Sequence, residues 1–275
     1  MIRFCGFADE ASADMKGQIE ALQRNGFSFL EIRGVDGVNI SEITREKAKE
    51  VRKMLDDAGL AVWSMGSPIG KIALNDDFGA HLDVYKRILE YADILGAQKI
   101  RMFSFYPVSG MSDEETKEKV FARLEEFCKV TPDGIMMCHE NEKEIFGESA
   151  ENCLAIHKAF PKIRAVFDPA NFVQSGVDTL KAWDLLHPYV EYFHVNDALS
   201  EQTVVPAGEG EGHLPELLKN YIQKGGEVLT LEPHLAVFPG FDKLENGASL
   251  KEGITYYQSG HEAFDAAATA LKKLL

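Results

Sequence analysis

Apolar residues along this chain alternate between two spacings. Short runs rich in branched and aromatic residues are each followed by a longer segment whose apolar residues recur three and four positions apart. The first spacing is typical of buried strands and the second of amphipathic helices. Strands are predicted at Ile2–Phe7, Phe27–Ile32, Ala61–Met65, Lys99–Phe103, Gly134–His139, Arg164–Asp168, Val190–Val195 and Glu227–Glu232. Helices are predicted at Ala13–Asn25, Arg45–Ala58, Phe78–Leu95, Asp113–Val130, Glu148–Ala159, Thr179–Leu186, Pro215–Lys224 and, roughly, His261–Leu275.

Residues at the helix ends support these boundaries. Ser112 stands directly before three acidic residues, Asp113 to Glu115, an arrangement typical of an N-cap with negative charge in the first turn. Glycine commonly ends a helix because it adopts the left-handed conformation without steric cost. Four glycines follow predicted helices and precede predicted strands: Gly26, Gly59, Gly96 and Gly225.

Repeated strand–helix units predict an α/β protein, and their number favours a closed (β/α)8 TIM barrel. The alternative is an open, doubly wound sheet, which typically carries a glycine-rich phosphate loop after its first strand. The sequence at that place is GFADEAS, which is not such a loop. Because no Pro/Ser-rich linker or low-complexity segment interrupts the pattern, we expect residues 1–275 to form a single domain.

Composition and charge exclude several classes of partner. The chain is 45% hydrophobic and 27% charged, as in ordinary globular proteins, and it contains no apolar run long enough to span a membrane. Its formal net charge of −15 would repel a phosphate backbone, which argues against nucleic acid binding. The four cysteines show no CxxC spacing, and the first residues do not resemble a secretory signal. We therefore expect a cytoplasmic protein with reduced cysteines.

Ionisable side chains end the last four predicted strands. These residues are Glu140, Asp168, His194 and Glu232. In a TIM barrel the C-terminal ends of the strands surround the active site, so these groups should converge. Carboxylates brought together in this way repel one another unless a cation joins them. Three carboxylates and one imidazole favour Mn²⁺, Mg²⁺ or Co²⁺ over a sulfur-rich structural zinc site.

Five motifs around these residues resemble those of the xylose-isomerase-like sugar phosphate isomerase/epimerase superfamily. They are HENE (139–142), FDPANF (167–172), FHVND (193–197), PAGEGEG (206–212) and TLEPH (230–234). The resemblance extends over nearly the whole chain. It implies a TIM barrel with a divalent metal bound by Glu140, Asp168, His194 and Glu232, with Mn²⁺ expected first and Mg²⁺, Co²⁺ or Zn²⁺ as alternatives. It also implies a homo-oligomer, as is frequent among such proteins.

The sequence departs from the ketose 3-epimerases of that superfamily at two positions. Asn171 stands where those epimerases usually have a substrate-binding histidine, and the arginine that often follows the metal-binding histidine has no counterpart after His194. Both departures concern substrate contacts and leave the four metal ligands in place. The substrate therefore stays open.

Five further residues are candidates for substrate binding, each with a structural alternative. They are Lys71, Arg101, Asn171, His234 and Arg33. Lys71 is equally compatible with a solvated loop position. Arg101 can instead pair with Glu31 or Glu140, and Arg33, close to Glu31, is open to the same interpretation. His139 should point away from the side of Glu140 and pack in the core.

The predicted site suits proton abstraction next to a carbonyl. A metal ion chelating a carbonyl and a neighbouring hydroxyl would acidify the intervening C–H bond. Glu140 and Glu232, each with one oxygen free of the metal, would remove and return the proton as catalytic bases. The resulting enediolate can lead to epimerisation, to aldose–ketose isomerisation, or to loss of a leaving group, as in inosose dehydratases or 3-keto-glycoside cleavage. The sequence does not choose among these outcomes.

The sequence argues against two other functional classes. DNA repair nucleases of the same superfamily use three zinc ions and more histidines, whereas Ser67 and Arg101 occupy the corresponding region here, in a strongly acidic chain. A non-catalytic sugar-binding barrel would be expected to lack a ligand or a base, and all four residues are present. The segments Ser67–Phe78 and Leu235–Gly253 are predicted to flank the pocket and to set its specificity.

Overall fold

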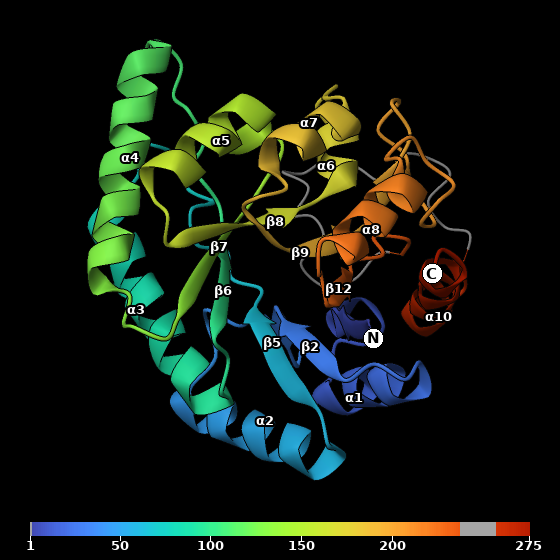
Figure 1. The fold of residues 1–275 in the computed structure, drawn as a ribbon. Helices are drawn as coiled ribbons and strands as arrows, with labels where there is room; N and C mark the ends of the chain where they lie inside the picture. Colours follow the sequence, from blue (N-terminus) through green and yellow to red (C-terminus); the bar gives the residue numbers. More distant parts are fainter. Residues whose placement is uncertain (1, 237–256) are drawn as a thin grey trace.

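The computed structural model describes residues 2–236 and 257–275 and shows a closed barrel of parallel strands with helices around it (Figure 1). Around the barrel the strand order is β1-β12-β9-β8-β7-β6-β5-β2. The predicted TIM barrel is thereby confirmed. The barrel strands are β1 (Arg3–Gly6), β2 (Phe29–Ile32), β5 (Ala61–Met65), β6 (Lys99–Met102), β7 (Met136–Glu140), β8 (Ile163–Phe167), β9 (Val190–Val195) and β12 (Val228–Leu231).

Helices follow the strands and cover the outside of the barrel (Figure 1). They are α1 (Met15–Arg24), α2 (Arg45–Ala58), α3 (Phe78–Leu95), α4 (Asp113–Val130), α5 (Ala150–Ala159), α6 (Pro169–Gln174), α7 (Thr179–Leu186), α8 (Leu214–Gln223) and α10 (Gly260–Lys273). The predicted bounds of α2, α3, α4 and α7 agree with the structure. The last helix, α10, lies beside α1, and Arg24 forms an ion pair with Asp265 there.

Small elements that the periodicity did not predict occur in the loops. Short 3₁₀ helices lie at Ala8–Glu10 and Phe146–Glu148, and α6 follows β8 directly. Two-residue strands form hairpins at β3 (Gly34–Val35) with β4 (Val38–Asn39) and at β10 (Asp197–Ala198) with β11 (Val204–Val205). The predicted specificity segment Leu235–Gly253 lies, after its first two residues, outside the described part of the chain.

The helix ends form as the sequence predicts. Ser112 accepts a hydrogen bond from the backbone N–H of Glu115, whose side chain in turn accepts one from the backbone of Ser112, and together these make a capping box. Gly59 and Gly96 end α2 and α3 in the left-handed conformation, with φ of 69° and 72°. Such ends satisfy the last helical carbonyls and turn the chain toward the next strand.

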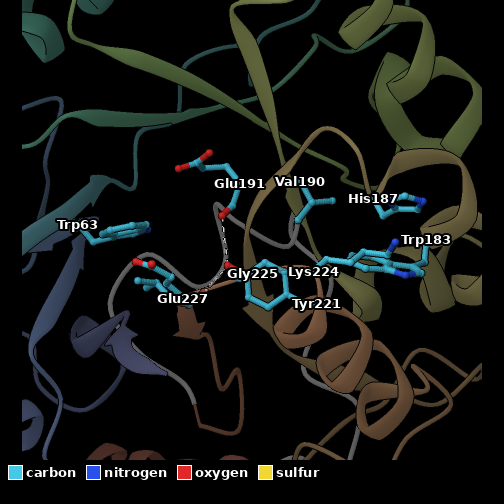
Figure 2. A pocket seen from close by; sticks show the side chains of 11 residues that line it. Trp63, Trp183, His187, Val190, Glu191, Tyr221, Lys224, Gly225 and Glu227 are labelled. Atoms are coloured by element: carbon cyan, nitrogen blue, oxygen red, sulfur yellow. Dashed lines mark hydrogen bonds between the residues drawn. The ribbon is translucent and has the colours of Figure 1, made fainter. Parts of the chain in front are cut away.

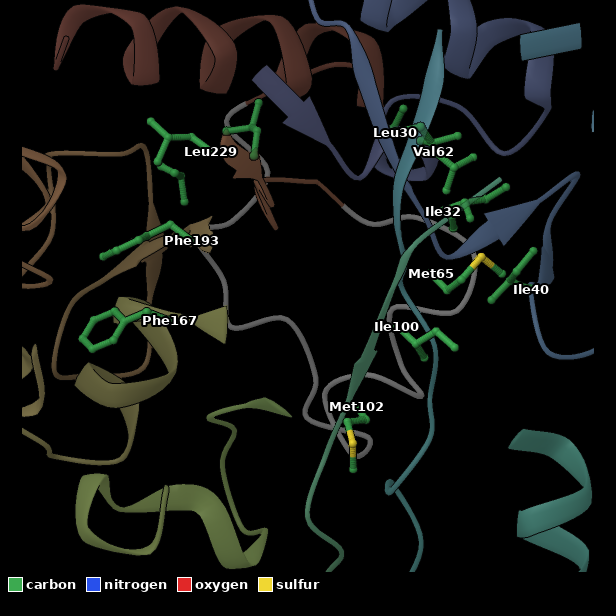
Figure 3. Close-up of a cluster of buried hydrophobic side chains, with 14 of the residues drawn as sticks. Leu30, Ile32, Ile40, Val62, Met65, Ile100, Met102, Phe167, Phe193 and Leu229 are labelled. Atoms are coloured by element: carbon green, nitrogen blue, oxygen red, sulfur yellow. The ribbon is translucent and has the colours of Figure 1, made fainter. Parts of the chain in front are cut away.

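Strand alternation divides the barrel residues between an outer core and the interior. Ile100, Met102, Phe193 and Leu229 belong to the main apolar cluster between the strands and helices (Figure 3). The residues between them in sequence take the other side. Part of the barrel interior is filled by Cys138, Val166 and Tyr192, which pack with Trp63 and Met136. The interior toward the C-terminal ends is instead polar.

The cysteines of this chain form no disulfide bond. All four cysteines are free thiols, and Cys5, Cys138 and Cys153 are buried. Within the described residues, no helix combines the length and the apolar character needed to cross a lipid bilayer.

Candidate metal centre

Four ionisable side chains meet at the C-terminal end of the barrel. Glu140 is the last residue of β7, Asp168 follows β8, His194 lies in β9 and Glu232 follows β12. Each offers one ligand atom, these atoms all lie within 4.8 Å of one another, and all four residues are buried. The structure thus brings together the four residues that the sequence predicted as metal ligands.

His194 stands at the centre of this cluster, with its Nδ1 turned toward the carboxylates. Nδ1 lies 2.7 Å from Oε1 of Glu140 and 2.9 Å from Oε2 of Glu232. The other ring nitrogen, Nε2, lies 3.2 Å from Oε2 of Glu31. The imidazole therefore contacts three carboxylates and lies at the point where their negative charges converge.

The chemistry of the cluster fits a divalent cation. Asp168 uses Oδ1 to accept the backbone N–H of Asn171, at the start of α6, while its buried Oδ2 has no hydrogen-bond partner among the described residues. Burial, together with the charges of Glu140 and Glu232, raises the pKa of Asp168 well above its ordinary value. Although burial opposes it, the carboxylates of Glu140, Glu31 and Glu232 raise the pKa of His194. A cation bound here would balance the carboxylate charges that raise both pKa values.

Two arginines hold the outer oxygens of the glutamates. Arg101 Nη1 lies 2.8 Å from Oε2 of Glu140, and Arg33 Nη1 lies 2.9 Å from Oε1 of Glu232. Arg33 also binds Asp9 and Glu10. In each glutamate the oxygen not facing His194 is thus hydrogen-bonded to a guanidinium. The sequence analysis expects this oxygen to be free of the metal and to act as a base, and the guanidinium takes only one of its two lone pairs.

A small cavity opens onto the cluster and contains four of the five predicted substrate-binding residues. Its lining side chains are Lys71, Arg101, Glu140, Glu142, Asn171, Glu232 and His234. Lys71 forms a 2.8 Å ion pair with Glu142 and lies 4.5 Å from the centre of the Phe103 ring. The side-chain amide of Asn171 donates to the carbonyl of Asn141. Arg33, the fifth candidate, is placed by its three carboxylate partners alongside Glu232 rather than in this lining.

His234 contributes a second group of ionisable residues next to the cluster. Its Nε2 lies 3.3 Å from Oε1 of Glu232 and 3.5 Å from Oε1 of Glu10, while its backbone N–H donates to Oε2 of Glu10. Its φ of 47° places a non-glycine residue in the left-handed region, a strain that tends to occur at functional sites. Burial raises the pKa of Glu10 to about 7, and Glu10 and Glu232 raise that of His234 to about 9 against the effect of burial.

His139 lies on the other side of β7 from Glu140, as strand alternation predicts. Its ring packs 5.8 Å from that of His157 on α5, between the barrel and the helices. Burial lowers the pKa of both imidazoles, which keeps them neutral core groups.

Two functions of buried acids were missed by the sequence analysis. Asp197 accepts hydrogen bonds from the backbone N–H groups of Gly208, Gly210 and Gly212, and so fixes the PAGEGEG loop over the end of β9. A Cβ atom at Gly210 would come within 2.3 Å of Asp197 Oδ1, which explains the glycine. Glu31 lies inside the barrel below His194. The sequence does hold a signal for this position: strand alternation in FLEI turns Glu31 to the side of the strand opposite Leu30 and Ile32.

A second pocket lies near the N-terminal ends of β9 and β12, away from the cluster. Figure 2 shows Trp63 on one side, Trp183 and His187 on the other, and Tyr221 between them. Its cavity volume is about 260 Å³. The acidic side chains of this pocket already have basic partners, since Glu191 pairs with Lys99 and Glu227 with Arg3. The described residues therefore concentrate the candidate chemistry at the opposite end of the barrel.

Comparison with known proteins agrees with the fold. The family model described as "Xylose isomerase-like TIM barrel" matches residues 19–273. An L-ribulose 3-epimerase structure is similar with a TM-score of 0.77 at 14% identity, covering 100% of this chain and 95% of that one. The IolI protein with a bound zinc atom has a TM-score of 0.74 at 16% identity, covering 99% and 98%. The probable 3-DHS dehydratase AsbF from Bacillus anthracis has a TM-score of 0.74 at 15% identity, covering 99% of each chain. Among curated proteins the chain has no match.

Proposed function

Because the chain belongs to the xylose isomerase-like TIM-barrel family, we propose that it is a divalent-metal-dependent enzyme that abstracts a proton next to the carbonyl of a sugar, keto-sugar or related polyol. The observation that carries this proposal is the buried convergence of Glu140, Asp168, His194 and Glu232 beneath a polar cavity. Isomerisation or epimerisation is the proposed outcome of that proton transfer.

The four converging residues would hold the metal ion. Their oxygen-rich composition favours Mn²⁺, with Mg²⁺, Co²⁺ or Zn²⁺ as alternatives, and the similar IolI structure carries zinc. When bound, such an ion supplies Lewis acidity that polarises a carbonyl and acidifies the neighbouring C–H bond. The charges support an ion at this place, because three buried carboxylates face one another around a single imidazole.

The side chains of the cavity would bind and orient the substrate. The ion pair of Lys71 with Glu142 presents both donors and acceptors to hydroxyl groups, and Asn171 and His234 line the same space. Arg101 and Arg33 fix Glu140 and Glu232 through one oxygen each, so neither carboxylate can rotate without breaking a buried ion pair. Glu140 and Glu232 are the proposed bases, one removing and the other returning the proton.

A lyase is the second candidate, because the same enediolate can expel a β-hydroxyl or an aglycone. The similar structures include both an epimerase and a probable dehydratase, and at 14% and 15% identity their likeness concerns the fold alone. A sugar-binding barrel without activity would be expected to have lost a ligand or a base. The presence of all four residues, with their ligand atoms within 4.8 Å of one another, favours an enzyme.

Deuterium exchange tests the proposal directly. The protein loaded with Mn²⁺, Co²⁺ or Mg²⁺ is incubated in D₂O with sugars, inososes and 3-keto-glycosides, and after the ion is removed by chelation NMR reports each C–H replaced by deuterium. We expect exchange at a carbon next to a carbonyl, lost on chelation before incubation and lost in Glu232→Gln. The labelled carbon and the product then distinguish epimerase, isomerase and lyase. Tight metal binding with no exchange across the whole panel would favour the non-catalytic barrel.

A further inference from the structure

Glu31 is a buried carboxylate inside the barrel, one layer below the metal-ligand cluster. Its side chain is 0% exposed, although it stands in a strand between Leu30 and Ile32. Burying a carboxylate is costly unless hydrogen bonds compensate it. Two side chains from β9 supply them: Tyr192 donates its hydroxyl to Oε1 at 2.8 Å, and Nε2 of His194 lies 3.2 Å from Oε2.

The contact with His194 determines which ring nitrogen faces the cluster. A metal binds an imidazole nitrogen that carries a lone pair, and the opposite nitrogen then carries the proton. An ionised carboxylate can only accept hydrogen bonds. With Glu31 at Nε2, the favoured neutral form has its proton on Nε2 and its lone pair on Nδ1. Nδ1 is the nitrogen that lies 2.7 Å from Glu140 and 2.9 Å from Glu232.

Glu31, on β2, is held in place by side chains from two other strands. Tyr192, which donates to it, lies two residues before His194 on β9, and the Tyr192 hydroxyl is 3.2 Å from Oγ of Ser64 on β5. Glu31 and Ser64 are partners in the register between β2 and β5. The His194 ring is further confined by edge contacts with Phe7 and Tyr192, at 5.1 Å and 5.5 Å between ring centres.

We propose that Glu31 is the positioning residue of the metal centre: it accepts the Nε2 proton of His194 and so presents Nδ1 as the metal ligand. Carboxylates in this position orient a ligating histidine and increase its basicity, and their loss typically weakens metal binding by about 10- to 100-fold. The inference rests on the proposed metal centre, though it is independent of which reaction the enzyme catalyses.

The test compares metal binding by two variants in the full chain. Glu31→Gln keeps the size of the side chain and removes its charge. Tyr192→Phe removes the other donor to Glu31 and leaves the Nε2 contact. By calorimetric titration of the metal-free proteins with Zn²⁺ and Mn²⁺, we expect the dissociation constant to rise about 10- to 100-fold in Glu31→Gln and only a few-fold in Tyr192→Phe. If Glu31→Gln does not fold, Glu31→Asp, which draws the carboxylate back from Nε2, is titrated in its place.

A spectroscopic measurement separates positioning from simple packing. In the Zn²⁺-loaded protein with ¹⁵N-labelled histidine, the wild type should show an Nε2-bound proton on His194 shifted downfield by its carboxylate acceptor. Glu31→Gln should move that signal upfield. An unchanged dissociation constant and signal in a folded Glu31→Gln protein would overturn the inference, as would equal losses in both variants. Failure of the wild type itself to bind metal would instead reject the metal centre.

Discussion

Arg33 and Glu232 form a buried ion pair in which Nη1 lies 2.9 Å from Oε1, at the edge of the cluster of Glu140, Asp168, His194 and Glu232. The other oxygen of the same carboxylate lies 2.9 Å from Nδ1 of His194. Glu232 is therefore held from two sides, by a permanent cation and by the cluster. Arg33 also binds Asp9 and Glu10, so one guanidinium balances three buried carboxylates, of which Glu232 belongs to the four-residue cluster and the other two lie outside it.

Removing this arginine should destabilise the protein far more than removing an exposed one. Arg33→Met removes the guanidinium that Asp9, Glu10 and Glu232 share, and breaking a buried ion pair in this way typically costs about 3–5 kcal/mol. Arg24→Met, which breaks the part-exposed pair with Asp265, is the matched control and should cost less than about 1 kcal/mol. Urea unfolding of the metal-free proteins measures both. Similar losses in the two variants would mean that the buried network contributes no more than a surface pair.

Glu232 is expected to be essential for turnover and dispensable for folding. Glu232→Gln keeps the shape of the side chain but removes a proton acceptor, which should lower the rate by at least about 10²- to 10⁴-fold. Glu227→Gln, at the exposed partner of Arg3 near the other end of the barrel, is the control and should leave the rate unchanged. Circular dichroism checks the fold, and the deuterium-exchange rate checks the chemistry. Undiminished exchange in Glu232→Gln would contradict the assigned role.

Residues that lie at the ends of periodic elements could be predicted from the sequence. The convergence of Glu140, Asp168, His194 and Glu232 could be predicted because each ends an apolar strand, and parallel strands bring their ends together. Helices such as α4 were predicted to their ends because capping residues mark them. These signals are local. They need only the alternation of strands and helices and the knowledge that a barrel closes.

Contacts between distant residues could not be predicted in this way. Arg33 and Glu232 are 199 positions apart, and their pairing depends on the register of β1 between β2 and β12. Alternation places Glu31 inside the barrel, but only the closed structure shows that Tyr192 and His194 are its partners. The short helix α6 was missed because its six residues hold too few turns for a periodic signal, although Asp168 and Pro169 form a normal helix start.

Asp168 and Asp197 are buried aspartates that each come just after a barrel strand. Replacing them with asparagine should change the stability of the metal-free protein in opposite directions. Asp168 adds to the repulsion with Glu140 and Glu232, so Asp168→Asn should leave the metal-free protein as stable or stabilise it by about 1 kcal/mol. Asp197 accepts backbone N–H groups from the glycine loop, and Asp197→Asn turns an amide group toward some of these donors. That change should cost about 1–3 kcal/mol.

Metal addition distinguishes the same two variants. A saturating divalent ion at 100 times its dissociation constant should stabilise the wild type by about 2.7 kcal/mol. We expect this gain to persist in Asp197→Asn and to be largely lost in Asp168→Asn, as measured by thermal unfolding with and without the ion. Loss of the metal effect in Asp197→Asn alone would show that the ion binds elsewhere than at the four-residue cluster.

Acid should destabilise the fold through His157, which is buried between α5 and the barrel. Its Nδ1 lies 3.1 Å from the carbonyl of Ile163, and its ring stacks on Tyr189 and meets His139 at an edge. Burial lowers its pKa from the ordinary 6.5 to about 4, a shift that the Ile163 hydrogen bond opposes and the charge of Arg164 reinforces.

The sign of the resulting pH dependence follows from proton binding. Between pH 6.5 and 4 the unfolded chain binds a proton at His157 that the folded protein does not, so stability falls as the pH is lowered through this window and is unaffected above it. The loss of stability by pH 5 should be about 2 kcal/mol relative to pH 8.

Two variants test this assignment. His157→Gln should reduce the difference in stability between pH 8 and pH 5 by that amount, whereas His187→Gln, at a partly exposed position, should not. Urea unfolding of the wild type and of both variants at the two pH values gives the six numbers needed. An acid-induced loss as large in His157→Gln as in the wild type would assign the effect to other groups, such as the carboxylates of the metal cluster.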